Sequence, residues 1–415
     1  LTPTQFNHPE DTLLSIAESA KKTDLPVWND ELYLETHRGT YTSKGQLKKN
    51  NRQSEILLQQ VEMLASFAWL KTGRYPQEQL DSAWKILLNT QFHDALPGTH
   101  VAKVYQYLLD EYRTLYDSTS DIRETASTDL FAENTGDNLL IFNPTLKERC
   151  GIIELPAFML DSRGIADETG APLFQQIIKT LDGQDKVLVQ LTGSIPAAGY
   201  RIFQLTQPLE NLTFDAVLVE ANVLENQYLR AEFNDKGELT SLYDKEIGRQ
   251  VLVEGEVGNR FQLYQDQPGN YDAWDIVASY IEYELPITGD CALTIDDEGA
   301  LCASLKLVRE CYDSTIRQRI SLQAESRQLI FETEIDWHER QRLLKVGFPV
   351  AVNTRYATYD IAYGNMERAT HRNTSYDAAK FEVPAHQWMD MSETGYGVAL
   401  LNDSKYGHEA HYHWM

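Results

Sequence analysis

The residues of this chain whose side chains are best suited to metal binding or catalysis are His93 and Asp94. They are adjacent in a segment that continues to Pro97 and Gly98. A neutral imidazole offers a lone pair to a metal ion, and an ionised carboxylate accepts hydrogen bonds from hydroxyl groups. The imidazole could therefore be one ligand of a metal site. A His-Asp pair at a helix end is otherwise a surface pair or a capping group, and a metal site usually takes three or four protein ligands.

An amphipathic helix is expected directly before this pair. Its apolar face is marked by Leu80, Ala83, Trp84, Leu87 and Leu88, which recur at helical spacing. Pro97 and Gly98 should end the helix, and Thr99 could cap the next one. At 100° per residue, Asp94 would fall near the apolar face and His93 about 220° away from it. We therefore expect His93 to face a cleft or a neighbouring domain.

Residues 91–99, with the sequence QFHDALPGT, resemble the QFHDxLPGT signature of glycoside hydrolase family 38, the α-mannosidases. Residues 31–43 resemble the GELYLExHRGTYTS segment of the same family. Residues 259–275, 370–384 and 396–407 resemble later segments, and all of them follow in the family's order. The resemblance extends over nearly the whole chain and is closest to the bacterial and cytosolic-type branch.

The resemblance implies a retaining α-mannosidase that uses one zinc ion and hydrolyses terminal α-mannosides of glycans or oligosaccharides. It implies that His93 is a zinc ligand and that Asp94 accepts hydrogen bonds from sugar hydroxyls in the catalytic site. In the family, zinc binds the mannose 2- and 3-hydroxyls and helps distort the ring toward the transition state. The nucleophile is a further Asp, which acts together with a carboxylic general acid.

One departure from the family changes the expectation for this chain. The family's zinc site also uses an N-terminal His-x-Asp pair, but none of the ten histidines is followed by x-Asp. We therefore expect the middle and C-terminal portion of such an enzyme, with the N-terminal catalytic domain as a missing partner. We also expect the family's sequence to continue beyond Met415, and the fragment to be inactive alone.

Three further residues are candidates for substrate binding. Arg38 lies in a His-Arg-Gly turn, and surface or interdomain pairing is the alternative to a substrate contact. Asp275 follows Trp274 in the segment 259–275, and aromatic rings and carboxylates suit the faces and hydroxyls of sugars. The alternative for Trp274 is a packed loop residue.

The elements that should position these residues give a multidomain α+β fold. Residues 1–42 should be the tail of the catalytic domain and its joint, with a strand at Leu32 and Leu34. Residues 43–130 should form a three-helix bundle, in which Ser43 caps the first helix and Gly73 ends it. The polar stretch 118–138 should be a linker. Residues 139–225 should form a small β domain, and residues 226–415 a large, truncated, mutarotase-like antiparallel sandwich.

The sandwich is predicted from an apolar period of two. Leu229, Ala231 and Phe233 lead into a turn with Gly237, as in a β-hairpin. Residues 329–337 alternate in the same way, with Leu329, Phe331 and other apolar residues between acidic ones. Such alternation is typical of antiparallel sheets with one buried face.

Composition limits the partners. The formal net charge is −25 over 415 residues, which argues against nucleic acids and anionic membranes. No apolar run is long enough for a membrane helix. The net charge fits a neutral substrate such as a sugar. The resemblance to the cytosolic-type branch implies a cytoplasmic location, and a homo-oligomer stays an open expectation.

A function of another class is also open. The chain could be a non-catalytic carbohydrate-binding or interaction module, made of a helical bundle and a mutarotase-like sandwich. Such a module would need aromatic platforms on an exposed sheet face. Coding sequence upstream of Leu1 that supplies His-x-Asp and a catalytic Asp would favour the enzyme.

Overall fold

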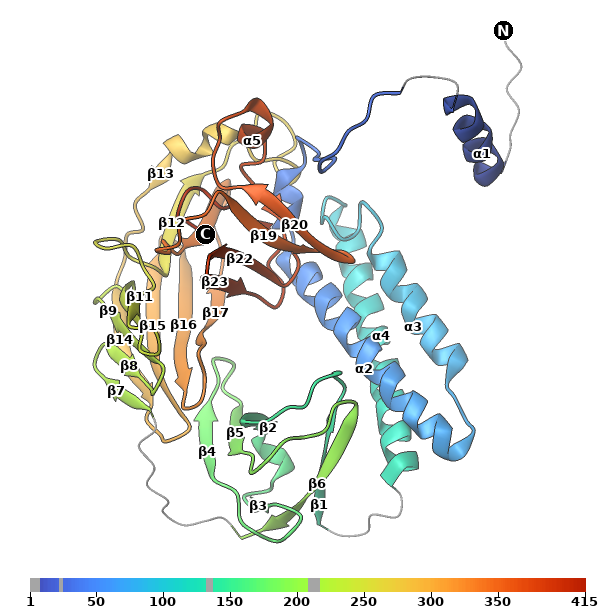
Figure 1. Cartoon of the computed structure of the whole chain (residues 1–415), viewed down its shortest axis with the longest axis vertical. Helices are drawn as coiled ribbons and strands as arrows, with labels where there is room; N and C mark the ends of the chain where they lie inside the picture. Colours follow the sequence, from blue (N-terminus) through green and yellow to red (C-terminus); the bar gives the residue numbers. More distant parts are fainter. Residues whose placement is uncertain (1–7, 22–24, 132–136, 208–216) are drawn as a thin grey trace. The chain divides into compact units, whose positions relative to one another are not determined.

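The computed structural model describes residues 8–21, 25–131, 137–207 and 217–415, which fall into two units, 1–35 and 36–415 (Figure 1). The first unit contains the helix α1 (Pro9–Ala20), with Pro9 at its first turn. Proline is tolerated there because the first N–H groups of a helix have no partner within the helix.

The strand predicted at Leu32 and Leu34 is not formed. Residues 31–34 have no regular secondary structure, and the two leucines are 88% and 61% exposed. A strand requires a neighbouring strand for its hydrogen bonds, and alternation alone does not supply one. The prediction was therefore wrong.

Helices α2 (Gly45–Thr72), α3 (Gln77–Thr90) and α4 (Ala102–Phe131) pack against one another as a bundle within the described residues 45–131 (Figure 1). Their shared core includes Leu58, Val61, Leu80, Leu87, Tyr112 and Leu115. As predicted, α2 ends at Gly73, whose φ of 72° favours glycine.

Two details of the bundle differ from the prediction. The stretch 118–131 is not a linker but the last part of α4, because Leu115, Thr119, Ile122 and Ala126 form a buried stripe at helical spacing. Ser43 does not cap α2, whose N-cap is Lys44. The Ser43 hydroxyl instead donates to the carbonyl oxygens of Gly39 and Ala273, at 3.0 and 2.7 Å.

Two three-stranded antiparallel sheets follow, β1-β6-β3 and β2-β5-β4. Their strands are β1 (Asn138–Asn143), β2 (Ile152–Pro156), β3 (Gly164–Ala166), β4 (Gln175–Lys179), β5 (Asp185–Gln190) and β6 (Gly199–Thr206), with a 3-10 turn, η2 (Ala157–Met159), after β2. Leu173, Val189 and Phe203 lie in their common core.

The remaining described strands form the large antiparallel region. A five-stranded sheet contains β7 (Leu218–Glu220), β8 (Val223–Glu225), β9 (Leu229–Phe233), β10 (Leu239–Asp244) and β11 (Arg249–Gln250). A four-stranded sheet contains β14 (Cys291–Asp297), β15 (Cys302–Cys311), β16 (Ser314–Gln323) and β17 (Leu329–Asp336). Phe233 of the first sheet and Ile320 of the second share one core, as in a sandwich.

Three further sheets complete this region. Their strands are β12 (Arg260–Gln265), β13 (Glu284–Leu285) and β18 (Arg342–Gly347), then β19 (Tyr356–Ile361), β20 (Gly364–Ala369), β22 (Trp388–Glu393) and β23 (Tyr396–Leu401), and finally β21 (Val383–Pro384) with β24 (Gly407–His408). Short helical segments η3 (Ala278–Glu282) and α5 (Ser375–Ala379) lie between strands.

The predicted hairpin is present. Strands β9 and β10 pair antiparallel, the turn contains Gly237 with φ of 71°, and Leu229, Ala231 and Phe233 are buried. In β17 the alternation is weaker than expected, because Ile335 at its end is 39% exposed. The bundle followed by antiparallel sheets confirms the predicted α+β class.

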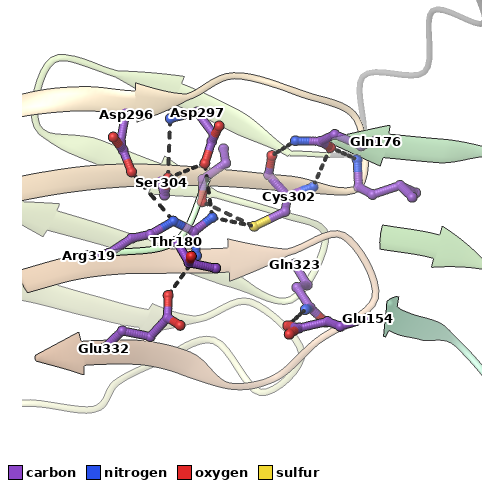
Figure 2. A network of polar contacts seen from close by, with 12 residues as sticks. Glu154, Gln176, Thr180, Asp296, Asp297, Cys302, Ser304, Arg319, Gln323 and Glu332 are labelled. Atoms are coloured by element: carbon purple, nitrogen blue, oxygen red, sulfur yellow. Dashed lines mark hydrogen bonds and ion pairs between the residues drawn. The ribbon is translucent and has the colours of Figure 1, made fainter. Parts of the chain in front are cut away.

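An ion cluster around the buried Arg319 lies on the sheet formed by β14 to β17, as Figure 2 shows. The guanidinium of Arg319 on β16, which is 3% exposed, lies 2.9 Å from Glu332, 3.1 Å from Asp297 and 3.5 Å from Asp296. At the end of the same sheet, the Gln176 side chain of β4 hydrogen-bonds the backbone of Leu301 and Cys302. Side-chain to backbone bonds thus join the small β domain to the sandwich.

No helix in the described parts of the chain is long and apolar enough to cross a membrane.

Candidate functional site

His93 and Asp94 lie in a series of turns rather than on a helix. The helix α3 ends at Thr90, well before Pro97, so the prediction that Pro97 ends it was wrong. The chain turns tightly, with the Ala95 N–H donating to Phe92 O at 2.8 Å. Gly98 has φ of 81°, and a Cβ there would lie 2.8 Å from Ser43 O. The turn after α3 therefore folds closely onto the segment before α2.

These turns leave the His93 and Asp94 side chains accessible. The side chains are 77% and 51% exposed, and His93 Nε2 lies 3.5 Å from Asp94 Oδ2. The Phe92 ring lies beside the imidazole, with 4.2 Å between centroids. Among the described residues, no hydrogen bond occupies the ring of His93. Its nitrogen lone pair is therefore available to an external ligand.

His93 borders a pocket with a volume of about 210 Å³. Residues from five segments line it, among them Thr40, Lys48, Gln91, His93, Pro384 and Tyr406. Thr40 belongs to the 3-10 turn η1 (Arg38–Tyr41), Lys48 to α2, and Tyr406 to the sandwich. The walls of the pocket thus come from both the bundle and the C-terminal region, and His93, the candidate metal ligand, lies at its border.

Lys48 holds the rim of this pocket in place. Its ammonium group donates to the carbonyl oxygens of Leu96 at 2.8 Å and Pro97 at 3.0 Å, and also to that of Ser43. No carboxylate among the described residues forms an ion pair with it. Burial lowers the pKa of Lys48 to about 7, because desolvation penalises the charged form. Lys48 therefore ties the turn that carries His93 to the start of α2.

Arg38, Asp275 and the neighbouring sandwich residues form a separate cluster. The Arg38 side chain is 8% exposed and lies 3.7 Å from Asp275 Oδ1. Its Nη2 donates to Ala379 O at 2.9 Å, and its guanidinium carbon lies 4.3 Å from the centre of the Phe381 ring. Arg38 is therefore engaged inside the protein, in the interdomain pairing that was the alternative to a substrate contact.

Gly39 allows the 38–41 turn to lie directly against the backbone of Trp274 and Asp275. Its N–H donates to Trp274 O at 3.1 Å, and a Cβ at this position would lie 3.0 Å from Asp275 N and 3.1 Å from the carbonyl carbon of Trp274. The Trp274 ring also packs against His37, with 4.6 Å between centroids. The backbones of the two segments therefore meet without room for a side chain.

The structure divides the five predicted residues into two groups, which η1 connects. One group is His93 and Asp94, and the other is Arg38, Trp274 and Asp275. Arg38 begins this turn and faces the sandwich, whereas Thr40 lies in it and lines the pocket with His93. A substrate contact for Arg38, Trp274 or Asp275 stays a prediction. Sequence reasoning missed Lys48, Gln91 and Tyr406 as pocket residues.

The sequence of α2 carried a signal of a buried polar network near this pocket. Asn51 and Ser54 fall on the same face as the buried Leu47 and Leu58, at helical spacing, and both are buried. Polar residues in line with an apolar stripe indicate a buried polar network. The partner Tyr406 lies 355 residues away from Asn51, and no local pattern identifies it.

The described residues do not form a metal site by themselves. They contain no group of three or more His, Cys, Asp or Glu side chains that could hold a metal ion. Zinc sites usually have three or four protein ligands. His93 is one accessible candidate for such a ligand. Other ligands would have to come from outside the described residues.

Family models match two parts of the chain. The alpha mannosidase middle domain matches residues 35–130, and the glycosyl hydrolases family 38 C-terminal domain matches residues 224–415. Together they account for well over half of the sequence.

Curated relatives show the same similarity. The chain is 35% identical to Alpha-mannosidase 2C1 of Homo sapiens over 406 residues, which covers 95% of this chain and 36% of the relative. It is 30% identical to Alpha-mannosidase G of Dictyostelium discoideum, covering 93% of this chain and 38% of the relative. The chain thus spans about a third of the length of the curated relatives that it matches.

Solved structures share the fold. A protein of glycosyl hydrolase family 38 from Enterococcus faecalis has a TM-score of 0.75 at 18% identity, covering 97% of this chain and 55% of that one. An alpha-mannosidase from Enterococcus faecalis V583 has a TM-score of 0.74 at the same identity, covering 97% of this chain and 54% of that one.

Proposed function

Because the chain belongs to glycoside hydrolase family 38, we propose that it forms the middle and C-terminal part of a zinc-dependent, retaining α-mannosidase. Its substrates would be terminal α-mannosides of glycans or oligosaccharides. The observation that carries the proposal is the accessibility of His93, whose side chain is 77% exposed beside a pocket and within the 91–99 segment.

His93 would supply one of the ligands that hold zinc. Its ring has no hydrogen-bond partner among the described residues, so a lone pair can be directed at a cation without breaking an existing contact. Lys48 would keep the turn in place through Leu96 and Pro97. When bound, zinc would supply a Lewis-acid contact for sugar hydroxyls.

Asp94 would bind the sugar itself. Its carboxylate is half exposed and lies 3.5 Å from His93, and an ionised carboxylate accepts hydrogen bonds from hydroxyl groups. The same sugar would then be held by Asp94 and by the ion that His93 binds. Trp274 and Asp275 are weaker candidates, because both are already in contact with the turn at Gly39.

The proposal includes an N-terminal catalytic region as the partner of this chain. Retaining glycosidases use two carboxyl groups, one as nucleophile and one as acid and base. That region would supply both of these, together with the remaining zinc ligands. The resemblance to the cytosolic-type branch supports a cytoplasmic location for the whole protein.

The experiment compares two proteins, the 415-residue chain and the product of the complete coding sequence that contains it. Both are assayed with an aryl α-mannoside, with and without a zinc chelator. We expect hydrolysis only by the complete product, with loss of activity on chelation and recovery on addition of zinc. A complete product that cannot hydrolyse α-mannosides, or is indifferent to chelation, would contradict the proposal.

The same experiment separates the alternative. If the complete coding sequence adds no further domain and the chain binds mannosides without hydrolysing them, the chain is a carbohydrate-binding module.

A further inference from the structure

A network of polar side chains lies directly behind the pocket. It consists of Asn51, Arg52 and Glu55 on α2, Gln91 after α3, and Tyr406 from the sandwich. Asn51 and Arg52 are 1% and 6% exposed. Because three separate segments meet here, the network fixes their side chains relative to one another.

Glu55 determines which way the Gln91 amide points. Gln91 Nε2 donates to Glu55 Oε1 at 2.8 Å and to Asn51 Oδ1 at 2.9 Å. An ionised carboxylate can only accept, so the amide nitrogen must face Glu55. Both N–H groups of the amide are then used. The carbonyl oxygen of Gln91 is left as an acceptor without a partner among the described residues.

Asn51 determines the role of the Tyr406 hydroxyl. Asn51 Oδ1 accepts from Gln91 Nε2. Asn51 Nδ2 therefore points the other way and donates to Glu55 Oε1 at 3.1 Å and to the Tyr406 hydroxyl oxygen at 3.1 Å. The Tyr406 oxygen therefore accepts from Asn51, and its own proton has no acceptor among the described residues. Burial raises the pKa of Tyr406, which keeps this proton on the phenol. The hydroxyl is thus available as a donor.

Gln91 and Tyr406 both line the pocket beside His93. One fixed acceptor and one donor together match a hydroxyl group, which both donates and accepts. Lys48 does not change this match, because its three ammonium hydrogens are directed at three backbone carbonyls. The pocket wall therefore has no unpaired cation that would select an anion.

We propose that Glu55 and Asn51 are positioning residues, which orient Gln91 and Tyr406 so that this wall of the pocket binds a hydroxyl group of a neutral polyol. Identifying that polyol as the mannosyl unit rests on the proposed function. The orientation of the two side chains does not depend on it.

The orientation is tested in the 415-residue chain by NMR with selective 15N-glutamine labelling. In the wild type we expect the side-chain amide protons of Gln91 to exchange slowly with water. Glu55→Gln replaces an obligate acceptor with an amide that competes as a donor, so these protons should exchange at least tenfold faster. Glu78→Gln is the matched control, since Glu78 lies in the first turn of α3, at the other end of the helix from Gln91.

Ligand binding is measured on the same samples with methyl α-D-mannopyranoside as the probe and glucuronate as the anionic control, by saturation-transfer NMR. Glu55→Gln and Tyr406→Phe should each weaken binding of the mannoside about fivefold, the loss expected for one hydrogen bond. Tyr406→Phe should leave the exchange of the Gln91 amide unchanged. That variant separates loss of the donor from loss of the network.

Unchanged exchange of the Gln91 amide in Glu55→Gln would overturn the positioning role. No binding of the mannoside by the wild type, equal binding by all variants, or preference for glucuronate would overturn the ligand class. If the predicted exchange and binding are found but the complete protein does not hydrolyse mannosides, the proposed function fails and this inference stands.

Discussion

Arg38 and His93 belong to two neighbouring segments, but their side chains differ in exposure and in the contacts that they make. The Arg38 side chain is 8% exposed and is in contact with Asp275, Ala379 and Phe381. The His93 side chain is 77% exposed and lies beside Asp94 and Phe92. A polar side chain whose hydrogen bonds and ion pairs are made within the protein contributes to the architecture. A polar side chain that makes few such contacts is available to a ligand.

The comparison separates two motifs that both supplied candidate functional residues in the sequence. The 38–41 turn joins the bundle to the sandwich through Arg38 and Gly39, and its other end borders the pocket. The 91–99 segment presents His93 and Asp94 on turns anchored by Lys48. The first segment should therefore respond to mutation through stability, and the second through function.

The largest effect is expected for His93→Ala in the complete protein. Loss of a zinc ligand should remove transition-state stabilisation of about 4 kcal/mol, which is roughly a thousandfold in kcat/KM for an aryl α-mannoside. His338→Ala is the matched control, because His338 is also exposed and lies 3.0 Å from Asp336. Loss of activity in both variants, or in neither, would show that the position of His93 is not special.

A second prediction concerns Arg38→Ala in the 415-residue chain. The change removes the guanidinium contacts with Asp275, with the carbonyl of Ala379 and with the Phe381 ring, so the free energy of unfolding should fall by about 2–3 kcal/mol. Arg113→Ala should change it by less than about 0.5 kcal/mol, since that exposed pair with Asp110 is solvated. Urea denaturation measures both variants, and equal values would refute the structural role of the joint.

Lys48 supplies a prediction about pH. Its pKa of about 7 in the folded chain lies below that of an unfolded lysine, near 10.5, so unfolding takes up a proton between these values. The free energy of unfolding should therefore rise with pH in this window, by at most about 1.4 kcal/mol per pH unit. Urea denaturation of wild type and Lys48→Met from pH 6 to 9 isolates this contribution. A stability difference that does not change with pH would contradict it.

The smallest effect is expected for His93→Ala in the 415-residue chain. The ring fills no core volume, so the free energy of unfolding should change by less than about 0.5 kcal/mol. Asp94→Ala should behave in the same way. A clear loss of stability in either variant, by urea denaturation, would place these residues in the architecture beside Arg38.

Much of the fold could be predicted from local patterns. The stripe from Leu58 to Ala68, the stop at Gly73 and the hairpin at Gly237 follow from spacing and from backbone preferences of glycine. One error arose where composition was judged without periodicity. The polar residues of 118–131 are helical because Ile122 and Ala126 continue the buried stripe of α4.

The site could be predicted only where it lies within one segment. His93 and Asp94 are adjacent in the sequence, but their exposure depends on the end of α3 at Thr90, which Pro97 did not indicate. The pairing of Asn51 with Tyr406 and of Arg38 with Asp275 depends on tertiary packing. Local spacing carries no information about such contacts.

The most direct test of the difference between His93 and Arg38 is the zinc content of the complete protein, measured by atomic emission after dialysis. We predict close to one zinc ion per polypeptide in the wild type and in His338→Ala, and a small fraction of that amount in folded His93→Ala. Equal zinc content in the wild type and His93→Ala would contradict the assignment of His93 as a metal ligand.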